Sequence, residues 1–155
     1  MKTFTAALLA LTVISSAGGA RDILVGILNS VGNDCEQIEI SDITPENAYV
    51  IGLSEDDFDK ITSAAYYTCL TTGGECGCVI CFSDSKSAAK IYNSLWKNYE
   101  FPACDGADKM IFLKSGTYVA FFKGDSENTD AKCRAFGDEF GAEAMKIIKN
   151  PAKIR

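Results

Sequence analysis

Histidine is absent from this 155-residue sequence. Histidine is the usual general base of serine and cysteine triads and a frequent ligand of catalytic zinc, so its absence disfavours those enzyme classes. The sequence also lacks a GxGxxG motif, a P-loop and a D-x-D-x-D-G calcium loop. We therefore expect no cofactor and no metal ion, and we assign no catalytic, cofactor-binding or metal-ligating residue.

Only one long apolar run is present, at the N-terminus. Lys2 supplies a positive charge, Phe4–Ile14 is apolar or small, and small residues follow as far as Ala20. This order is typical of a signal peptide, and the run is shorter than the ~20 apolar residues of a membrane-spanning helix. We predict a signal peptide over residues 1–20 that is cleaved, and one secreted, extracellular domain without a membrane span over residues 21–155.

The mature chain is predicted to be acidic. Cleavage is expected near Ala17 to Ala20, and removal of residues 1–20 leaves 135 residues that begin at Arg21. Their 14 basic and 21 acidic side chains give a net charge of −7. A chain of this length can form one domain with a hydrophobic core. Its basic residues form no run, so we expect neither nucleic acid nor anionic lipid as a partner.

All seven cysteines lie in the mature part, where export would allow disulfides to form. Because seven is odd, at most three intrachain bonds can form. A two-residue turn at Gly73-Gly74 would place Cys69 opposite Cys78 as a non-hydrogen-bonded pair, so we predict the disulfide Cys69–Cys78. The partners of the other cysteines are left open: Cys35, Cys76, Cys81, Cys104 and Cys133.

Two functional alternatives use the same cysteines. Cys78-Val79-Ile80-Cys81 has the CxxC spacing of a redox pair, but Val-Ile favours an extended backbone and the next helix begins after Cys81. Cys76, Cys78 and Cys81 could instead bind zinc or copper, but alternating strand faces would separate these ligands. Cys81 is expected to be buried against the helices. Structural disulfides are the favoured interpretation.

The spacing of apolar residues predicts a two-layer domain. We expect an α+β sandwich, stabilised by disulfides, in which helices pack on a four-stranded, mainly antiparallel sheet. The first half of the mature chain is predicted to contain a helix over Arg21–Val31, alternation at Ile38–Ile40, a short strand over Tyr49–Leu53 and a short helix from Ser54 to Ile61. A hairpin from Ala64 to Phe82 and a helix from Ser83 that ends before Pro102 are predicted next. The remaining predicted elements are a hairpin from Lys109 to Phe122, a loop over Gly124–Asp130 and a helix over Ala131–Lys149.

Carboxylates and aromatic residues offer further candidate sites. A carboxylate pair could hydrolyse a glycosidic bond without histidine, but the acids around Asp56 and Asp57 are better explained as the first turn of a helix. The remaining candidates of this kind are Glu55, Asp59, Asp105 and Asp108. Neighbouring aromatic residues on a strand point to opposite faces, so one of each pair could be exposed for binding. The aromatic candidates are Trp96, Tyr66, Tyr67, Phe121 and Phe122.

Three segments resemble a family of small exported bacterial proteins of unknown function. They are Gly52–Asp57, Val79–Lys90 and Lys114–Val119, and the resemblance covers most of the mature chain. The lipid-bearing cysteine of that family is absent after the signal peptide, so no lipid anchor is expected. The resemblance implies export and no particular activity.

A second resemblance is to fungal killer-toxin-like secreted proteins and effectors. It rests on the alanine- and leucine-rich leader and on the order of Cys69, Val79–Phe82, Cys104 and Cys133 around a strand, a helix and a hairpin. This chain departs from the family in its acidity and its odd number of cysteines, which puts channel blocking in doubt. The resemblance implies a secreted protein of the toxin or effector kind.

These features predict a secreted, non-enzymatic, disulfide-stabilised protein that acts through surface contact with another macromolecule, as an effector, a toxin or a binding module. Its partner would be a protein or a cell-surface target. The alternative is a secreted thiol-disulfide or carboxylate-dependent enzyme.

Overall fold

The computed structural model describes residues 18–32 and 35–154. The predicted signal peptide lies outside the described residues except for its last three positions. These described residues form three α-helices, three short 3-10 helices (η) and six strands. They are α1 (Ala20–Val31), β1 (Ile38–Asp42), η1 (Pro45–Ile51), η2 (Glu55–Lys60), β2 (Ile61–Cys69), β3 (Cys76–Phe82), α2 (Ser85–Asn98), β4 (Lys109–Ser115), β5 (Tyr118–Gly124), α3 (Ser126–Phe140), β6 (Ala144–Lys149) and η3 (Pro151–Lys153).

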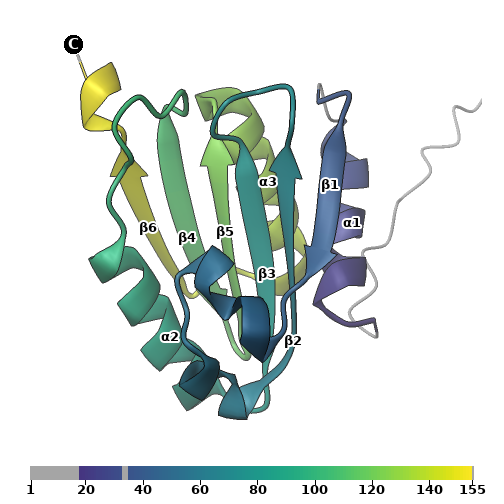
Figure 1. Cartoon of the computed structure of the whole chain (residues 1–155). Coiled ribbons are helices and arrows are strands. Elements are labelled where there is room, and N and C mark those ends of the chain that lie inside the picture. The colour runs from purple at the N-terminus through teal and green to yellow at the C-terminus, as the bar shows by residue number, and fades with distance from the viewer. Residues whose placement is uncertain (1–17, 33–34, 155) are drawn as a thin grey trace, which may run out of the picture.

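The strands form one antiparallel sheet in the order β1-β2-β3-β5-β4-β6 (Figure 1). The prediction of an α+β domain with an antiparallel sheet and helices is confirmed. The prediction of four strands is wrong, because β1 and β6 add one edge strand on each side. Both are only partly buried. Their apolar pattern is consequently weaker than that of the central hairpins.

The C-terminal third differs most from the prediction. The expected loop over 124–130 contains the start of α3, where the Asp125 carboxylate accepts a hydrogen bond from the Asn128 amide at 2.9 Å. The expected helix over 131–149 ends at Phe140, because Gly141 takes a positive φ of 77° that interrupts the helix. Ile147 and Ile148 then lie on opposite faces of β6, although their spacing also suits a helix.

The segment Tyr49–Leu53 is not a strand. Tyr49 to Ile51 completes η1, which begins at a capping box formed by Thr44 and Asn47. The short helix expected after Ser54 is present as η2. Together, η1 and η2 cover the part of the sheet that α2 leaves open.

Helices cover both faces of the sheet, so the predicted two-layer arrangement is wrong and the domain has three layers (Figure 1). Helices α1 and α3 pack on one face around Tyr67, Phe122 and Phe136. Helix α2 packs on the other face with η1 and η2, around Ile80 and Phe112. Strand β3 is buried along its whole length because it lies between these layers.

The predicted disulfide Cys69–Cys78 is also wrong. Cys78 pairs with Tyr66 rather than with Cys69, because the hairpin loop is longer than the two residues of the expected turn. Cys69 and Cys78 therefore face opposite sides of the sheet. The structure has a disulfide between Cys35 and Cys69, with a Cα–Cα distance of 6.0 Å. The disulfide ties the segment after α1 to the end of β2. The other five cysteines are free thiols.

Within residues 18–32 and 35–154, no helix is both long enough and apolar enough to cross a membrane.

Candidate functional site

The candidate site is a recess between α2, the end of η1 and the sheet. It has a volume of about 230 Å³ and opens to solvent. Its lining combines apolar side chains with a few polar ones, as in most ligand-binding pockets. The residues that line it are Val50, Ile51, Gly52, Tyr66, Cys76, Ser94, Leu95, Asn98, Tyr99, Met110, Phe112, Phe121 and Lys123.

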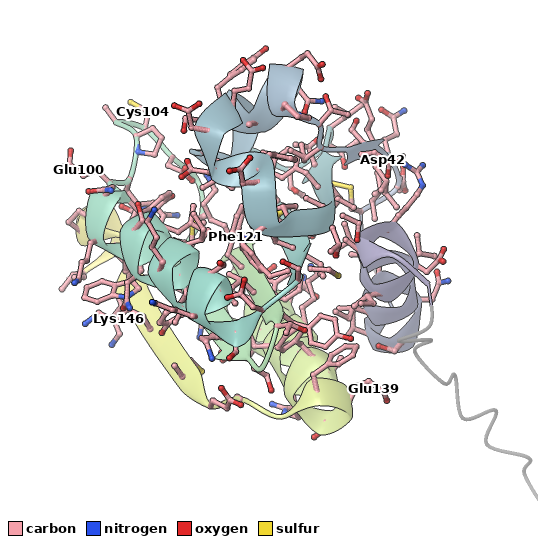
Figure 2. The ribbon with its side chains drawn as sticks, turned by 90° about the horizontal axis from the view of Figure 1, so that it is seen from below. Asp42, Glu100, Cys104, Phe121, Glu139 and Lys146 are labelled. Atoms are coloured by element: carbon pink, nitrogen blue, oxygen red, sulfur yellow. A yellow bond between two sulfur atoms is a disulfide. The ribbon has the colours of Figure 1, made fainter. Side chains whose placement is uncertain are left out.

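The floor of this recess is formed by side chains of β4 and β5 that point to the α2 face of the sheet, because side chains alternate in direction along a strand. Phe112 and Phe121 are paired across β4 and β5, and their ring centroids lie 5.8 Å apart. Both rings face α2, and Figure 2 places Phe121 close to that helix. Leu95 of α2 forms the facing wall. Gly52, with a φ of 77°, reverses the chain after η1 and so forms the mouth of the recess.

One end of the recess is polar. The Lys123 ammonium lies 2.7 Å from the Asp105 carboxylate, and the two side chains are 12% and 4% exposed. The second oxygen of Asp105 accepts a hydrogen bond from the Ala107 amide at 2.9 Å. The pair is therefore neutral overall and held by the loop before β4. It gives the recess a polar wall without a free charge.

Three further polar side chains line this end. Burial raises the pKa of the Cys76 thiol, and Lys123 and a hydrogen bond from Tyr66 offset this only in part. Burial also raises the pKa of the Tyr66 and Tyr99 hydroxyls. Cys76 is thus kept protonated near neutral pH, and a protonated thiol is a weak nucleophile. The Tyr99 hydroxyl is buried and has no hydrogen-bond partner among the described residues.

The CxxC residues do not form a pair. Cys78 packs under α2 and Cys81 packs on the α1 face, because they are three residues apart on an extended strand. Burial raises the pKa of both thiols. The expectation that Cys81 is buried against helices is confirmed, but Cys76 and Cys78 are equally buried because the other face is covered too. In the described part of the chain, no group of three or more histidine, cysteine or acidic residues could hold a metal ion.

Three of the candidate carboxylates, Asp57, Asp105 and Asp108, have local structural partners. Asp57 accepts hydrogen bonds from the backbone and side chain of Ser54 and so caps η2, whose first turn also contains Glu55 and Asp56. Asp105 pairs with Lys123, and Asp108 accepts a hydrogen bond from the Ser126 amide at the start of α3. These carboxylates therefore stabilise helix ends and the wall of the recess.

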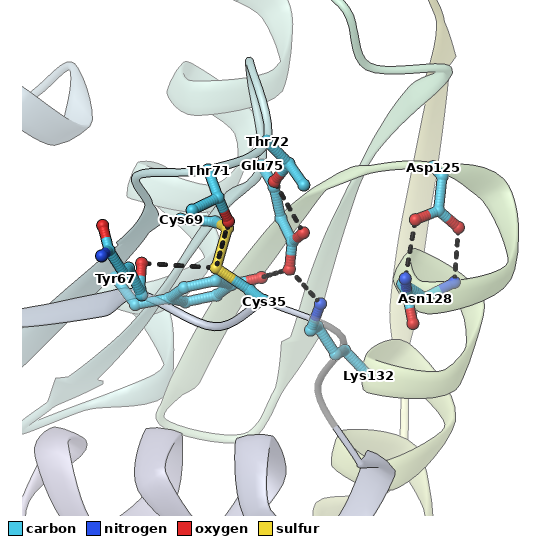
Figure 3. The surroundings of a disulfide bond; sticks show 10 residues. Cys35, Tyr67, Cys69, Thr71, Thr72, Glu75, Asp125, Asn128 and Lys132 are labelled. Carbon is cyan, nitrogen blue, oxygen red and sulfur yellow. Dashed lines mark hydrogen bonds and ion pairs between the residues drawn. A yellow bond between two sulfur atoms is a disulfide. The ribbon is translucent and has the colours of Figure 1, made fainter.

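A buried ion pair lies near the disulfide, on the other face of the sheet (Figure 3). Lys132 of α3 contacts Glu75 at 2.8 Å, and the two side chains are 2% and 7% exposed. Glu75 also accepts hydrogen bonds from Tyr67 and Thr72. These contacts fix the β2–β3 loop to α3. These contacts could not be predicted from the sequence, because a lysine in a helix is usually exposed.

The predicted aromatic candidates are divided between the two faces. Tyr66 and Phe121 line the recess or its floor, whereas Tyr67 and Phe122 belong to the core under α1 and α3. Trp96 is half-buried and packs against the edge of the core under α2, beside Lys146 of β6. The sequence thus supplied two of the lining residues. The recess itself was not predictable, because residues of η1, β2, β3, α2, β4 and β5 meet there.

Fold and site define a small, disulfide-bonded α+β domain with an apolar recess on one helical layer. No protein-family model, curated protein or solved structure matches the chain. The two family resemblances therefore stay predictions.

Proposed function

We propose that this chain is an exported, non-enzymatic protein that acts by contact with another macromolecule, as an effector, a toxin or a binding module does. The observation that carries the proposal is the open recess together with its apolar rim. Tyr49 and Val50 of η1 are 76% and 44% exposed, and Val50 lines the recess. A large apolar side chain exposed beside a cavity is typical of protein contact surfaces.

The size of the recess supports a partner side chain as its occupant. About 230 Å³ is below the roughly 300–1,000 Å³ of pockets for drug-sized ligands. A large apolar side chain of a partner protein would enter it, while Tyr49 would pack beside that side chain. Such anchors commonly contribute a large share of the binding energy.

Export is supported by the N-terminal leader pattern and by the disulfide Cys35–Cys69, which is compatible with an oxidising compartment. The thiol-enzyme alternative is less well supported, because Cys78 and Cys81 face apart and are kept protonated by burial.

Binding to cells tests the proposal. Fluorescently labelled mature protein is titrated onto cells that grow alongside the producing organism, with unlabelled protein as competitor. We expect saturable binding that Tyr49→Ser weakens about tenfold, equal to about 1.4 kcal/mol. Ser94→Trp, which fills the recess from α2, should weaken it at least as much.

Met145→Ser is the matched control, because Met145 is also an exposed apolar side chain but lies on β6, on the face away from the recess. An equal loss in this control would contradict the proposed surface. So would binding that unlabelled protein cannot compete. Disulfide exchange activity that depends on Cys78 or Cys81 would favour the enzyme instead.

A further inference from the structure

The fold gathers lysines on one side of an otherwise acidic domain. Helix α2 and strand β6 contain five lysines and no acidic residue. Lys86, Lys90 and Lys97 are four and seven residues apart, so they share one face of α2. That face is opposite the buried one, which contains Ala88, Ile91, Tyr92 and Leu95. The three lysines therefore point away from the sheet into solvent.

Strand β6 adds a fourth lysine to this face. Lys146 pairs with Phe112 across β4 and β6, which directs its side chain to the α2 side of the sheet. Its ammonium lies 4.8 Å from the centre of the Trp96 ring on α2, and Lys97 lies 5.5 Å from the same ring. Figure 2 shows Lys146 beside α2. Lys86, Lys90, Lys97 and Lys146 are named the lysine ridge below.

Among the described residues, the lysine ridge has no ionic partner. All four side chains are exposed, and the ion pairs of the described residues involve other cations. The ridge extends about 16 Å along α2, at 1.5 Å per residue. At physiological salt, charges farther away than about 8 Å are largely screened. A partner at the ridge therefore experiences these lysines more than the net negative charge of the chain.

We propose that the lysine ridge binds a linear acidic polysaccharide, carboxylated or sulfated, outside the cell. The proposal rests on the proposed export, which would bring the chain to such polymers. A thin polyanion can follow a surface that is one helix, about 10 Å, wide. A nucleic acid duplex or a bilayer is broader and would also meet the acidic side chains of η2, which lies near the start of α2.

The two broader partners are also disfavoured by the ridge itself. A helix that binds a bilayer presents an apolar face to it, whereas the apolar face of α2 is buried against the sheet. Proteins that bind single-stranded nucleic acid combine a basic groove with free aromatic faces. Here the surface is a ridge, and two lysines already lie against Trp96.

The test measures binding of the purified mature protein to heparin and to polygalacturonate at about 50 and 200 mM salt. We expect saturable binding to at least one polymer, weaker at the higher salt. The triple variant Lys86→Gln/Lys90→Gln/Lys97→Gln should lower the affinity at least tenfold at low salt. Lys146→Gln alone should lower it severalfold.

The matched control removes the same net charge elsewhere. Arg134→Gln/Lys149→Gln/Lys153→Gln changes three exposed cations outside the ridge, and affinity should stay within twofold of the unmodified protein. An equal loss in both triple variants would overturn the proposal, because net charge alone would then explain binding. Tighter binding to duplex DNA or to phosphatidylserine vesicles would overturn it too, as would no binding to either polysaccharide.

Tyr49→Ser separates this proposal from the recess. The variant should bind polysaccharide normally, because Tyr49 is not part of the ridge. If the protein binds no polysaccharide, the cell-binding experiment with Tyr49→Ser can still support the proposed function. If Tyr49→Ser has no effect on cell binding, the polysaccharide experiment can still support the lysine ridge.

Discussion

At the scale of single residues, the ion pair between Glu75 and Lys132 is the most sensitive polar contact. Both side chains are buried, and removing one partner leaves the other charge without compensation. We predict that Lys132→Met lowers the free energy of unfolding by about 3–5 kcal/mol. Urea denaturation of the unmodified protein and of the Lys132→Met variant measures this difference.

Two further variants complete this prediction. Lys153→Met changes an exposed lysine and should leave stability within about 0.5 kcal/mol. The double variant Glu75→Leu/Lys132→Met should recover much of the loss, because no unpaired charge remains. A Lys132→Met chain as stable as the unmodified one would contradict a compensated, buried pair.

The five free thiols differ in accessibility. Cys104 is exposed, whereas Cys76, Cys78, Cys81 and Cys133 are buried. Burial raises the pKa of all four buried thiols, and that of Cys133 to about 12. Because thiolates are the reactive form, iodoacetamide at pH 8 should modify Cys104 alone in the native protein. Mass spectrometry of peptides measures this.

Unfolding in urea without reductant should make the other four thiols reactive. Modification of Cys78 or Cys81 in the folded protein would show an accessible thiolate. This result would favour the alternative function, a thiol-disulfide enzyme that uses Cys78 and Cys81.

At the scale of elements, the start of α1 bears on where the predicted leader would be cleaved. Ala20 is 0% exposed, and its amide donates a hydrogen bond to the Ser63 hydroxyl at 2.9 Å. The Gly19 carbonyl accepts from the amides of Asp22 and Ile23. A mature chain that begins at Arg21, as the sequence suggested, would lose these contacts. Cleavage after Ala17 would keep them and still satisfy the preference for small residues.

We therefore predict that a chain beginning at Gly18 is more stable than one beginning at Arg21 by about 2 kcal/mol, from lost hydrogen bonds and a lost buried methyl group. Thermal and urea denaturation of both chains tests this. Equal stability would show that residues 18–20 do not support the fold.

The disulfide Cys35–Cys69 should contribute strongly to stability, because it closes a long loop. Its two cysteines are 34 residues apart, for which loop-closure entropy gives about 3–4 kcal/mol. Cys69→Ser should lower the free energy of unfolding by that amount, as measured by urea denaturation. Cys104→Ser, at an exposed free thiol, is the control and should have little effect. A larger loss of stability in Cys104→Ser than in Cys69→Ser would contradict the Cys35–Cys69 pairing.

The sequence predicted the elements whose apolar patterns are strong. Helices α1 and α2 and the central hairpins were found because Ile23, Ile27 and Leu95 follow helical spacing and β3 is almost wholly apolar. Strand β6 was missed because Ile147 and Ile148 also suit a continued helix. Only Gly141 marked the break.

The error in the hairpin had a different cause. Gly73-Gly74 looked like a two-residue turn, but only Gly74 takes a positive φ, and the Cys69 amide bonds to the Glu75 carbonyl at 3.1 Å. The loop therefore contains five residues, 70–74, between those two bonded positions. A change in loop length alters every cross-strand pair, so it also changed the disulfide partner.

At the scale of the whole molecule, charge distribution was the least predictable property. Net charge indicates an acidic surface, yet α2 and β6 present only lysines among their charged residues. Lys86, Lys90 and Lys97 could be placed on one helix face from the sequence. Lys146 could not, because it joins them only through the pairing of β4 with β6. The recess was hidden for the same reason, since it depends on tertiary packing.

The proposals share one physical premise, that the chain is exported and closes its Cys35–Cys69 bond outside the cytosol. A non-reducing peptide map of the protein, recovered separately from medium and from cell extract, tests this directly. We expect protein in the medium that lacks residues 1–17 and carries one crosslink, between the peptides of Cys35 and Cys69. Native protein found in the cytosol, with Met1 to Ala17 still attached and all seven cysteines reduced, would contradict it.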